Sequence, residues 1–216
     1  MRRTKEEAAR TREAIVEGAL ACFDRYGITS STVEQIAAEA GVTRGAVYHH
    51  FAGKREILHA IRERVSLPFL DRADTALLRE HECSPLDRIE RFLASVVDAL
   101  EKDPRHCRAV RVMQLRCEYV GDLAEELASG VRNVDRLGKA LTAAYREARA
   151  SGELVEGLAP EVAAVETLMF MNGMVRLWIV HASGAALRRS ARAAIEAHVH
   201  LRRARSGPAR GRPRPR

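Results

Sequence analysis

The chain has 216 residues, 46% of them hydrophobic and 30% charged, a composition typical of a globular protein with a buried core and not of a disordered chain. Its formal net charge of +7 is matched by seven arginines among the last fifteen residues, which hold no acid, so net charge alone does not indicate a nucleic-acid partner. The sequence opens on charged residues without a following apolar run, unlike a secretory signal. Its most apolar stretch, residues 167–175, is too short to span a bilayer. We therefore expect a cytoplasmic protein with no membrane segment.

Helix signals follow one another along the whole chain, while alternating strand patterns are nearly absent. A capping box at Thr4–Glu7 starts a helix that ends near Gly27, and a second box at Ser31–Glu34 starts a short helix that ends at Gly41. Thr43 caps a third helix, and Gly53 precedes a fourth. Later helices are expected to begin at Ser84-Pro85 and Asp103-Pro104 and to cover roughly residues 122–150, 160–181 and 187–203. The pattern predicts an all-α fold of about nine helices, followed by a disordered Arg-rich tail at 204–216.

The segment from Ser31 to Lys54 contains two short helices that meet at Gly41, where a positive φ allows a sharp turn. Its inward face is apolar: Val33, Ile36, Val42, Val47 and Phe51. This spacing is typical of a helix-turn-helix, whose second helix enters the major groove of DNA. The alternative is a generic helical hairpin with a polar outer face.

The outward residues of the second helix favour DNA. Thr43 and Arg44 stand at its N-terminus, and arginine can bond guanine O6 and N7 together. Gly45 allows the backbone to approach the DNA closely. Phosphate donors are expected from Tyr48, His49 and His50, and from Lys54 at the start of the next helix.

The run A-G-V-T-R-G-A-V-Y-H-H-F-A-G-K-R-E-I-L resembles the signature of the TetR family of bacterial repressors, and the opening R-R-T-K-E-E-A resembles its AcrR/TtgR-type branch, which controls multidrug efflux pumps. The resemblance implies a DNA-binding domain at 1–55, a helical ligand-binding and dimerisation domain at 56–203, and no enzymatic activity or cofactor. It also implies binding to a palindromic double-stranded operator as a repressor that a small apolar or aromatic ligand releases. The implied DNA contacts are Thr32, Thr43, Arg44, Gly45, Tyr48, His49, His50 and Lys54.

Apolar stripes at helical spacing recur in the body, and for any single stripe an ordinary core is the alternative to a ligand cavity. The resemblance implies that the stripes enclose a cavity. The candidate lining residues are Ile89, Phe92, Leu93, Val96, Val110, Gln114, Val134, Leu137, Leu141, Leu168, Met171, Asn172 and Arg176. Asn172 is the main polar candidate, because a buried amide needs hydrogen-bond partners, although a structural hydrogen bond would explain it equally well. Val110 is apolar where efflux-repressor relatives can carry a polar group, so the ligand range of those relatives does not carry over.

The resemblance further implies a homodimer through the last two helices. Gly173 would allow close backbone approach, and Trp178 and Ile179 would offer apolar area, unless both belong to the core of one chain.

Several alternatives stay open at this stage. No enzyme motif or zinc-ligand spacing occurs, and the four cysteines indicate ordinary thiols rather than a redox or metal sensor. A regulator of a metabolic or biosynthetic operon, or a non-specific architectural DNA binder that uses the arginine tail, would fit the same features. The tail itself is either a solvated segment or an arm that strengthens DNA binding.

Overall fold

The computed structural model describes residues 5–79, 82–118, 121–180 and 185–204, and within these ranges the chain is almost entirely helical. The described part contains nine α-helices in chain order: α1 (Lys5–Tyr26), α2 (Val33–Glu39), α3 (Arg44–His50), α4 (Lys54–Asp74), α5 (Pro85–Lys102), α6 (Pro104–Leu115), α7 (Ala124–Ala150), α8 (Pro160–Val180) and α9 (Ala185–His200). A π-helical turn, Thr75–Arg79, extends α4, and a 3-10 turn, Gly121–Leu123, precedes α7. The predicted all-α fold of about nine helices is confirmed, while the tail at 205–216 lies outside the described residues.

Side-chain caps fix three of the predicted helix starts. The hydroxyls of Thr43 and Ser84 each accept a hydrogen bond from the backbone N–H three residues later, at 3.1 and 3.2 Å. Asp103 Oδ1 accepts from the backbone N–H groups of Arg105 and His106, at 2.9 and 3.1 Å. These bonds satisfy donors that the first turn of a helix leaves without a partner, which is why the starts can be read from the sequence.

The second helix starts one residue later than predicted. Thr32 is its N-cap, because its hydroxyl accepts from the Gln35 N–H while Gln35 Oε1 accepts from the Thr32 N–H. The Ser31 hydroxyl donates to the Gly27 carbonyl at 2.7 Å and is buried, so it cannot cap the helix. The predicted box at Ser31–Glu34 is therefore wrong, and Thr4 of the first predicted box lies outside the described residues.

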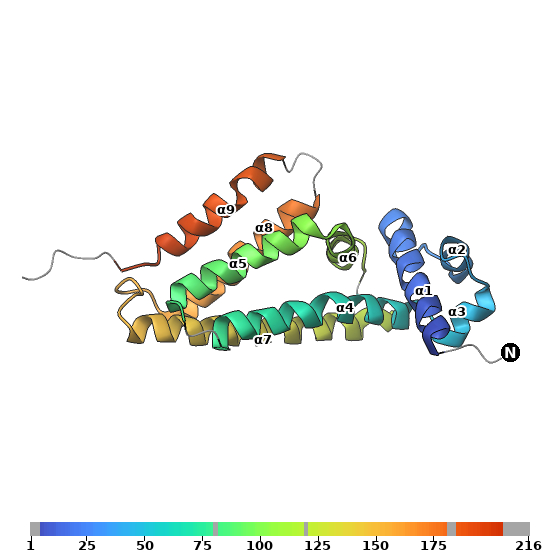
Figure 1. Cartoon of the computed structure of the whole chain (residues 1–216), viewed down its shortest axis with the longest axis horizontal. Helices are drawn as coiled ribbons and strands as arrows, with labels where there is room; N and C mark the ends of the chain where they lie inside the picture. Colours follow the sequence, from blue (N-terminus) through green and yellow to red (C-terminus); the bar gives the residue numbers. More distant parts are fainter. Residues whose placement is uncertain (1–4, 80–81, 119–120, 181–184, 205–216) are drawn as a thin grey trace, which may run out of the picture.

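The helices form an elongated molecule with α1, α2 and α3 grouped at one end (Figure 1). α4 leaves this group and runs along α7, while α8 packs against α7, and α9 packs against α5. α6 lies where α1 meets the body and contacts α1, α4, α5 and α8. The predicted domain boundary after residue 55 stays a prediction; α4 starts at Lys54 and continues into the body without a break.

One apolar core runs through both regions of the molecule. On α1, the predicted inward face around Ile15, Ala19 and Phe23 is fully buried. On α5, the whole predicted stripe from Ile89 to Leu100 is buried. Both stripes repeat at i, i+3, i+4 spacing, which places their members on one side of a helix.

α8 is a strongly apolar helix. Within the described ranges it is the one helix whose length and composition would allow it to cross a membrane, with a mean hydropathy of 1.3 over its most apolar window. However, 44% of that window is buried inside the fold. Its apolar side chains therefore divide between the core and an outward face.

Candidate functional site

The exposed face of α3 carries most of the residues that were expected to contact DNA. Val47 and the following Phe51 are buried at 0% and 1% exposure and fix the helix against the core. The opposite side exposes Thr43, Arg44, Gly45, Tyr48 and His49. Because Val47 points inward, these residues can contact the major groove of DNA without disturbing the core.

Arg44 is held in place by two neighbours. Its guanidinium lies 2.8 Å from a carboxylate oxygen of Glu34 on α2 and 5.4 Å from the centre of the Tyr48 ring. Both partners of the ion pair are more than half exposed. An exposed pair of this kind contributes at most about 1 kcal/mol, so Arg44 can exchange Glu34 for a base edge at little cost.

The ammonium group of Lys54 is engaged in hydrogen bonds within the chain. Its Nζ donates hydrogen bonds to the backbone carbonyls of Ile28, Thr29 and Ser31, at 2.8, 3.0 and 2.8 Å. Burial lowers the pKa of this ammonium from its usual value. In the described conformation Lys54 therefore ties the start of α4 to the loop between α1 and α2, and its predicted phosphate contact stays a prediction.

The remaining two predicted contacts are only partly available. Thr32 is exposed, but its hydroxyl is engaged in the cap of α2. His50 is half-buried, and its ring meets the ring of His49 edge-on, with centroids 5.2 Å apart. The structure thus brings five of the eight predicted residues onto one open face, with Thr32, His50 and Lys54 held in local contacts.

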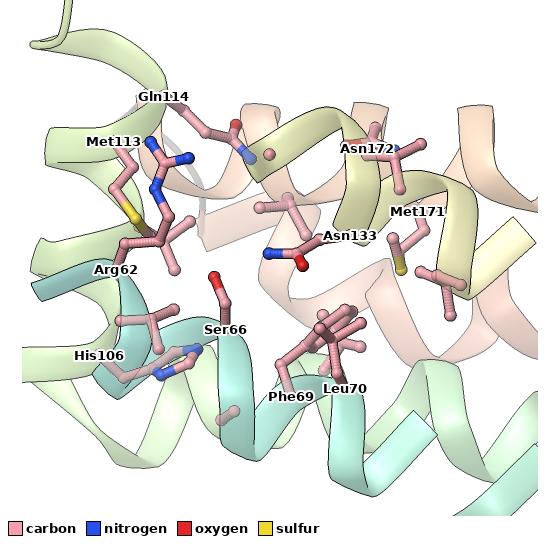
Figure 2. Close-up of a pocket in the computed structure, with 18 of the residues that line it drawn as sticks. Arg62, Ser66, Phe69, Leu70, His106, Met113, Gln114, Asn133, Met171 and Asn172 are labelled. Atoms are coloured by element: carbon pink, nitrogen blue, oxygen red, sulfur yellow. The ribbon is translucent and has the colours of Figure 1, made fainter. Parts of the chain in front are cut away.

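A second feature of the molecule is a cavity of about 260 Å³ in the body, walled by α4, α5, α6, α7 and α8 (Figure 2). Eight predicted residues line it: Val96, Val110, Gln114, Val134, Leu137, Leu168, Met171 and Asn172. Its size and largely apolar wall fit a small organic molecule.

Five predicted lining residues lie elsewhere. Ile89, Phe92, Leu93 and Leu141 are fully buried in the core, because only the last turns of the α5 stripe reach the cavity. Arg176 is exposed and its guanidinium lies 3.4 Å from the Gln114 carbonyl.

Asn172 also differs from its expected environment. It was predicted to be a buried amide, but it is exposed and donates to the Leu168 carbonyl of its own helix at 2.9 Å. It borders the cavity without being enclosed by the core.

The sequence-based prediction missed the α4 wall of the cavity. Five α4 residues line it: Arg62, Val65, Ser66, Phe69 and Leu70. Their spacing is that of one helix face, which is a signal that could have been found. It was hidden because Arg62 and Ser66 interrupt the apolar pattern.

Comparison with known proteins identifies the family. Residues 15–61 match the family described as "Bacterial regulatory proteins, tetR family". The chain is 34% identical over 180 residues to the HTH-type transcriptional regulator TtgR of Pseudomonas putida, covering 83% of this chain and 85% of that protein. It is also 34% identical over 185 residues to the HTH-type transcriptional repressor BepR of Brucella suis, with the same coverage. The chain belongs to the TetR family.

A solved relative shares the complete fold. SmeT, the repressor of the Stenotrophomonas maltophilia multidrug efflux pump SmeDEF, is 30% identical with a TM-score of 0.71, covering 94% of this chain and 97% of that chain. A second structure of SmeT, in complex with triclosan, gives a TM-score of 0.76 at 31% identity. This TetR-family protein is accordingly a DNA-binding transcriptional regulator and not an enzyme.

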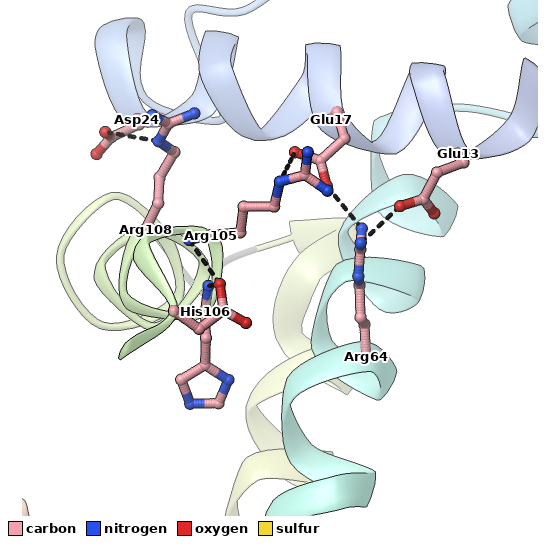
Figure 3. A network of polar contacts seen from close by, with 8 residues as sticks. Glu13, Glu17, Asp24, Arg64, Arg105, His106 and Arg108 are labelled. Carbon is pink, nitrogen blue, oxygen red and sulfur yellow. Dashed lines mark hydrogen bonds and ion pairs between the residues drawn. The ribbon is translucent and has the colours of Figure 1, made fainter. Parts of the chain in front are cut away.

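In this TetR-family regulator, ion pairs join the DNA-binding helices to the body (Figure 3). Arg64 on α4 lies 2.5 Å from Glu13 and 2.8 Å from Glu17 on α1, and Arg105 on α6 lies 3.9 Å from Glu17. Asp24, near the end of α1, meets two further α6 arginines, Arg108 at 3.9 Å and Arg111 at 3.2 Å. We call this set the α1 seam.

His106 connects the seam to the cavity. It follows Arg105 on α6, and its ring points away from α1 (Figure 3) into the wall of the cavity. Burial lowers its pKa, with the charge of Arg72 acting in the same direction. One short helix thus faces the cavity on one side and the DNA-binding region on the other.

The outer face of α8 presents a separate apolar surface. Five side chains that are about half exposed or more lie on it: Val162, Val165, Met169, Leu177 and Val180. Trp178 and Ile179, which were expected on this surface, are instead buried at 2% and 4% exposure. That prediction is wrong, because both side chains pack into the core of the same chain.

Proposed function

We propose that this protein is a cytoplasmic repressor that binds a palindromic operator as a homodimer and that a small apolar or aromatic ligand in the body cavity releases it. The exposed face of α3, with Arg44 at its N-terminus, supports base reading in the major groove. The names of two relatives, BepR as a transcriptional repressor and SmeT as the repressor of a multidrug efflux pump, support repression and an efflux or transporter operon as the target.

The observation that carries the proposal is the position of α6. Its residues His106, Val110 and Gln114 line the cavity, while its arginines pair with α1 across the seam. A ligand that fits better when α6 is displaced favours a conformation in which α1, and with it α3, is placed differently. Coupling of this kind is typically worth about 1–3 kcal/mol, which corresponds to a 5- to 150-fold change in operator affinity.

The outer face of α8 supports the homodimer. A helix of a monomer gains nothing from five apolar side chains in water, whereas the same face becomes buried when two copies meet. Gly173 lies on the exposed side of this helix, and a Cβ added there would meet nothing within 4 Å, which leaves room for a partner to approach. A dimer also gives the operator two recognition helices, which strengthens binding through effective concentration.

Selection of DNA from a random pool by the full-length protein tests the proposal. We expect an inverted repeat whose half-sites are separated by about one helical turn, bound by two chains. Sedimentation of the complex gives the number of chains. Uniform recovery of all sequences would instead identify a non-specific architectural binder and overturn the operator proposal.

A further inference from the structure

The cavity wall contains a buried ion pair. Arg62 on α4 and Glu126 in the first turns of α7 are 4% and 5% exposed, and Arg62 Nε lies 3.1 Å from Glu126 Oε2. The other oxygen of Glu126 lies 3.2 Å from Nδ1 of His59, whose side chain is half exposed. Gly130, one turn further along α7, leaves space beside the guanidinium, since a Cβ there would stand 3.6 Å from an Arg62 terminal nitrogen.

This pair makes the cavity formally neutral. Of the residues that the structure places around the cavity, Arg62 and Glu126 are the one arginine and the one carboxylate, and burial lowers the pKa of His106, which favours its uncharged form. The other polar lining groups near Arg62, such as Gln114 and Asn133, are neutral amides.

The polar groups are not spread evenly. Figure 2 shows Arg62 and Gln114 together at one side of the cavity, with Asn133 between them and Met171, while Phe69 and Leu70 close another side. A ligand is thus offered a polar end and a more apolar end, where Asn172 beside Met171 adds one further amide.

The Arg62–Glu126 pair determines which ligands gain binding free energy when they enter the cavity. A charged group leaves its hydration shell on entry and needs a counter-charge inside, but Arg62 and Glu126 already offset each other. An anion attracted by Arg62 is also repelled by Glu126, so it gains less than it would beside an unpaired arginine, and the reverse holds for a cation. A hydroxyl or amide loses less hydration and can both accept from and donate to the guanidinium, carboxylate and amides of the polar end.

We propose that the Arg62–Glu126 pair is the specificity determinant of the cavity and that it selects uncharged amphiphiles, molecules with an apolar body and one hydroxyl or amide end, over both cations and anions. The inference rests on the proposed role of the cavity as the ligand site. It also predicts a reciprocal effect. Glu126→Gln leaves the Arg62 charge without its counter-charge and turns the preference toward anions, and Arg62→Gln leaves the Glu126 charge and turns it toward cations.

Calorimetry on the full-length protein without DNA tests this with three probes of one shape: 2-naphthol, 2-naphthoate and 2-(aminomethyl)naphthalene at pH 7. We expect the wild type to bind 2-naphthol at least tenfold more tightly than either ion. In Glu126→Gln the ratio of naphthoate to naphthol affinity should rise at least tenfold, and in Arg62→Gln the ratio for the ammonium probe should rise likewise. Glu125→Gln is the matched control, because Glu125 is the adjacent carboxylate, is exposed and pairs with Arg55 outside the cavity; it should keep the wild-type order.

The wild-type order decides the matter even if a variant fails to fold, which melting curves reveal. A wild type that prefers either ion, or folded variants that all keep the wild-type ratios, would overturn the inference. Binding of none of the three probes would overturn this inference together with the proposed role of the cavity as the ligand site. If 2-naphthol is preferred but leaves operator affinity unchanged, only the proposed release mechanism fails.

Discussion

Replacing Lys54 by methionine separates two possible roles of this side chain. The structure gives Lys54 a structural role, because its Nζ donates to three carbonyls of the loop that joins α1 to α2. The expectation from the sequence was a phosphate contact. Methionine keeps much of the length and apolar volume of the side chain and removes the charge and the donors.

The expected loss can be worked out from these contacts. A hydrogen bond from a charged group contributes about 1.5–3 kcal/mol. The carbonyls of Ile28 and Ser31 are bonded in half-buried surroundings, whereas the bond to Thr29 is exposed and is readily replaced by water. Two effective bonds, discounted because Lys54 itself is only half-buried, give a fall of about 2–4 kcal/mol in the free energy of unfolding.

Urea unfolding measures that fall, and operator binding over a series of salt concentrations measures phosphate contacts. A side chain that neutralises a phosphate changes the slope of log K against log salt by about 0.9. We expect Lys54→Met to lower stability and operator affinity without changing this slope. Arg55→Met is the matched control, since Arg55 is the next residue and its exposed pair with Glu125 contributes less than about 1 kcal/mol. Unchanged stability of Lys54→Met together with a slope reduced by about 0.9 would refute the structural role.

Three further predictions concern the DNA face, the cavity and α9. Arg44→Ala should weaken operator binding by about 1–3 kcal/mol and relax the preference at one base in each half-site, as binding to single-base operator variants would show; an unchanged preference profile would exclude base reading by Arg44. Asn172→Ala should change the calorimetric affinity for 2-naphthol more than the affinity for the operator, whereas equal losses with a lower melting temperature would indicate a structural role. His198 should make folding sensitive to acid: burial, and then the charge of Arg202, lower its pKa from 6.5 to about 4, so the unfolded chain takes up the proton first and stability is lost as the pH falls from 6.5 to 4. The loss of stability is at most about 3 kcal/mol. His198→Gln should remove this loss from urea unfolding curves recorded across the same pH range, and the glutamine still offers a partner to Thr167, whose hydroxyl lies 3.0 Å from His198 Nε2. A variant that keeps the full loss would show that other groups cause it.

The DNA-binding end could be predicted well because its determinants are local. The Thr43 hydroxyl caps the helix that follows it by accepting from the N–H three residues later, and Gly41 turns the chain with a φ of +66°. Val47 and Phe51 point inward at helical spacing. Each of these rules operates within a few residues of sequence. The contacts that Lys54 makes in the structure could not be predicted in this way, since its partners lie 23–26 residues earlier in the chain.

The cavity was harder to predict because core and cavity residues share the same pattern. Leu93 and Val96 stand on one face of α5, yet only Val96 reaches the cavity. Arg62 was missed because a buried arginine becomes plausible only once Glu126, 64 residues later, is known to stand beside it.

The two faces of α8 could not be told apart for another reason. Trp178 faces the core while its neighbour Leu177 is 59% exposed, and both are apolar. A helix whose outer face is also largely apolar shows only a weak periodicity to indicate which side turns inward. Only the packing of α6, α7 and α9 against the helix settles the orientation.

The central claim is that occupation of the cavity lowers operator affinity through α6. The most direct measurement is fluorescence anisotropy of the selected operator, titrated with the full-length protein in the absence and presence of 2-naphthol at a concentration that calorimetry shows to saturate the protein. We predict a 5- to 150-fold weaker operator affinity with 2-naphthol bound. An operator affinity that stays the same while the cavity is saturated would contradict the account.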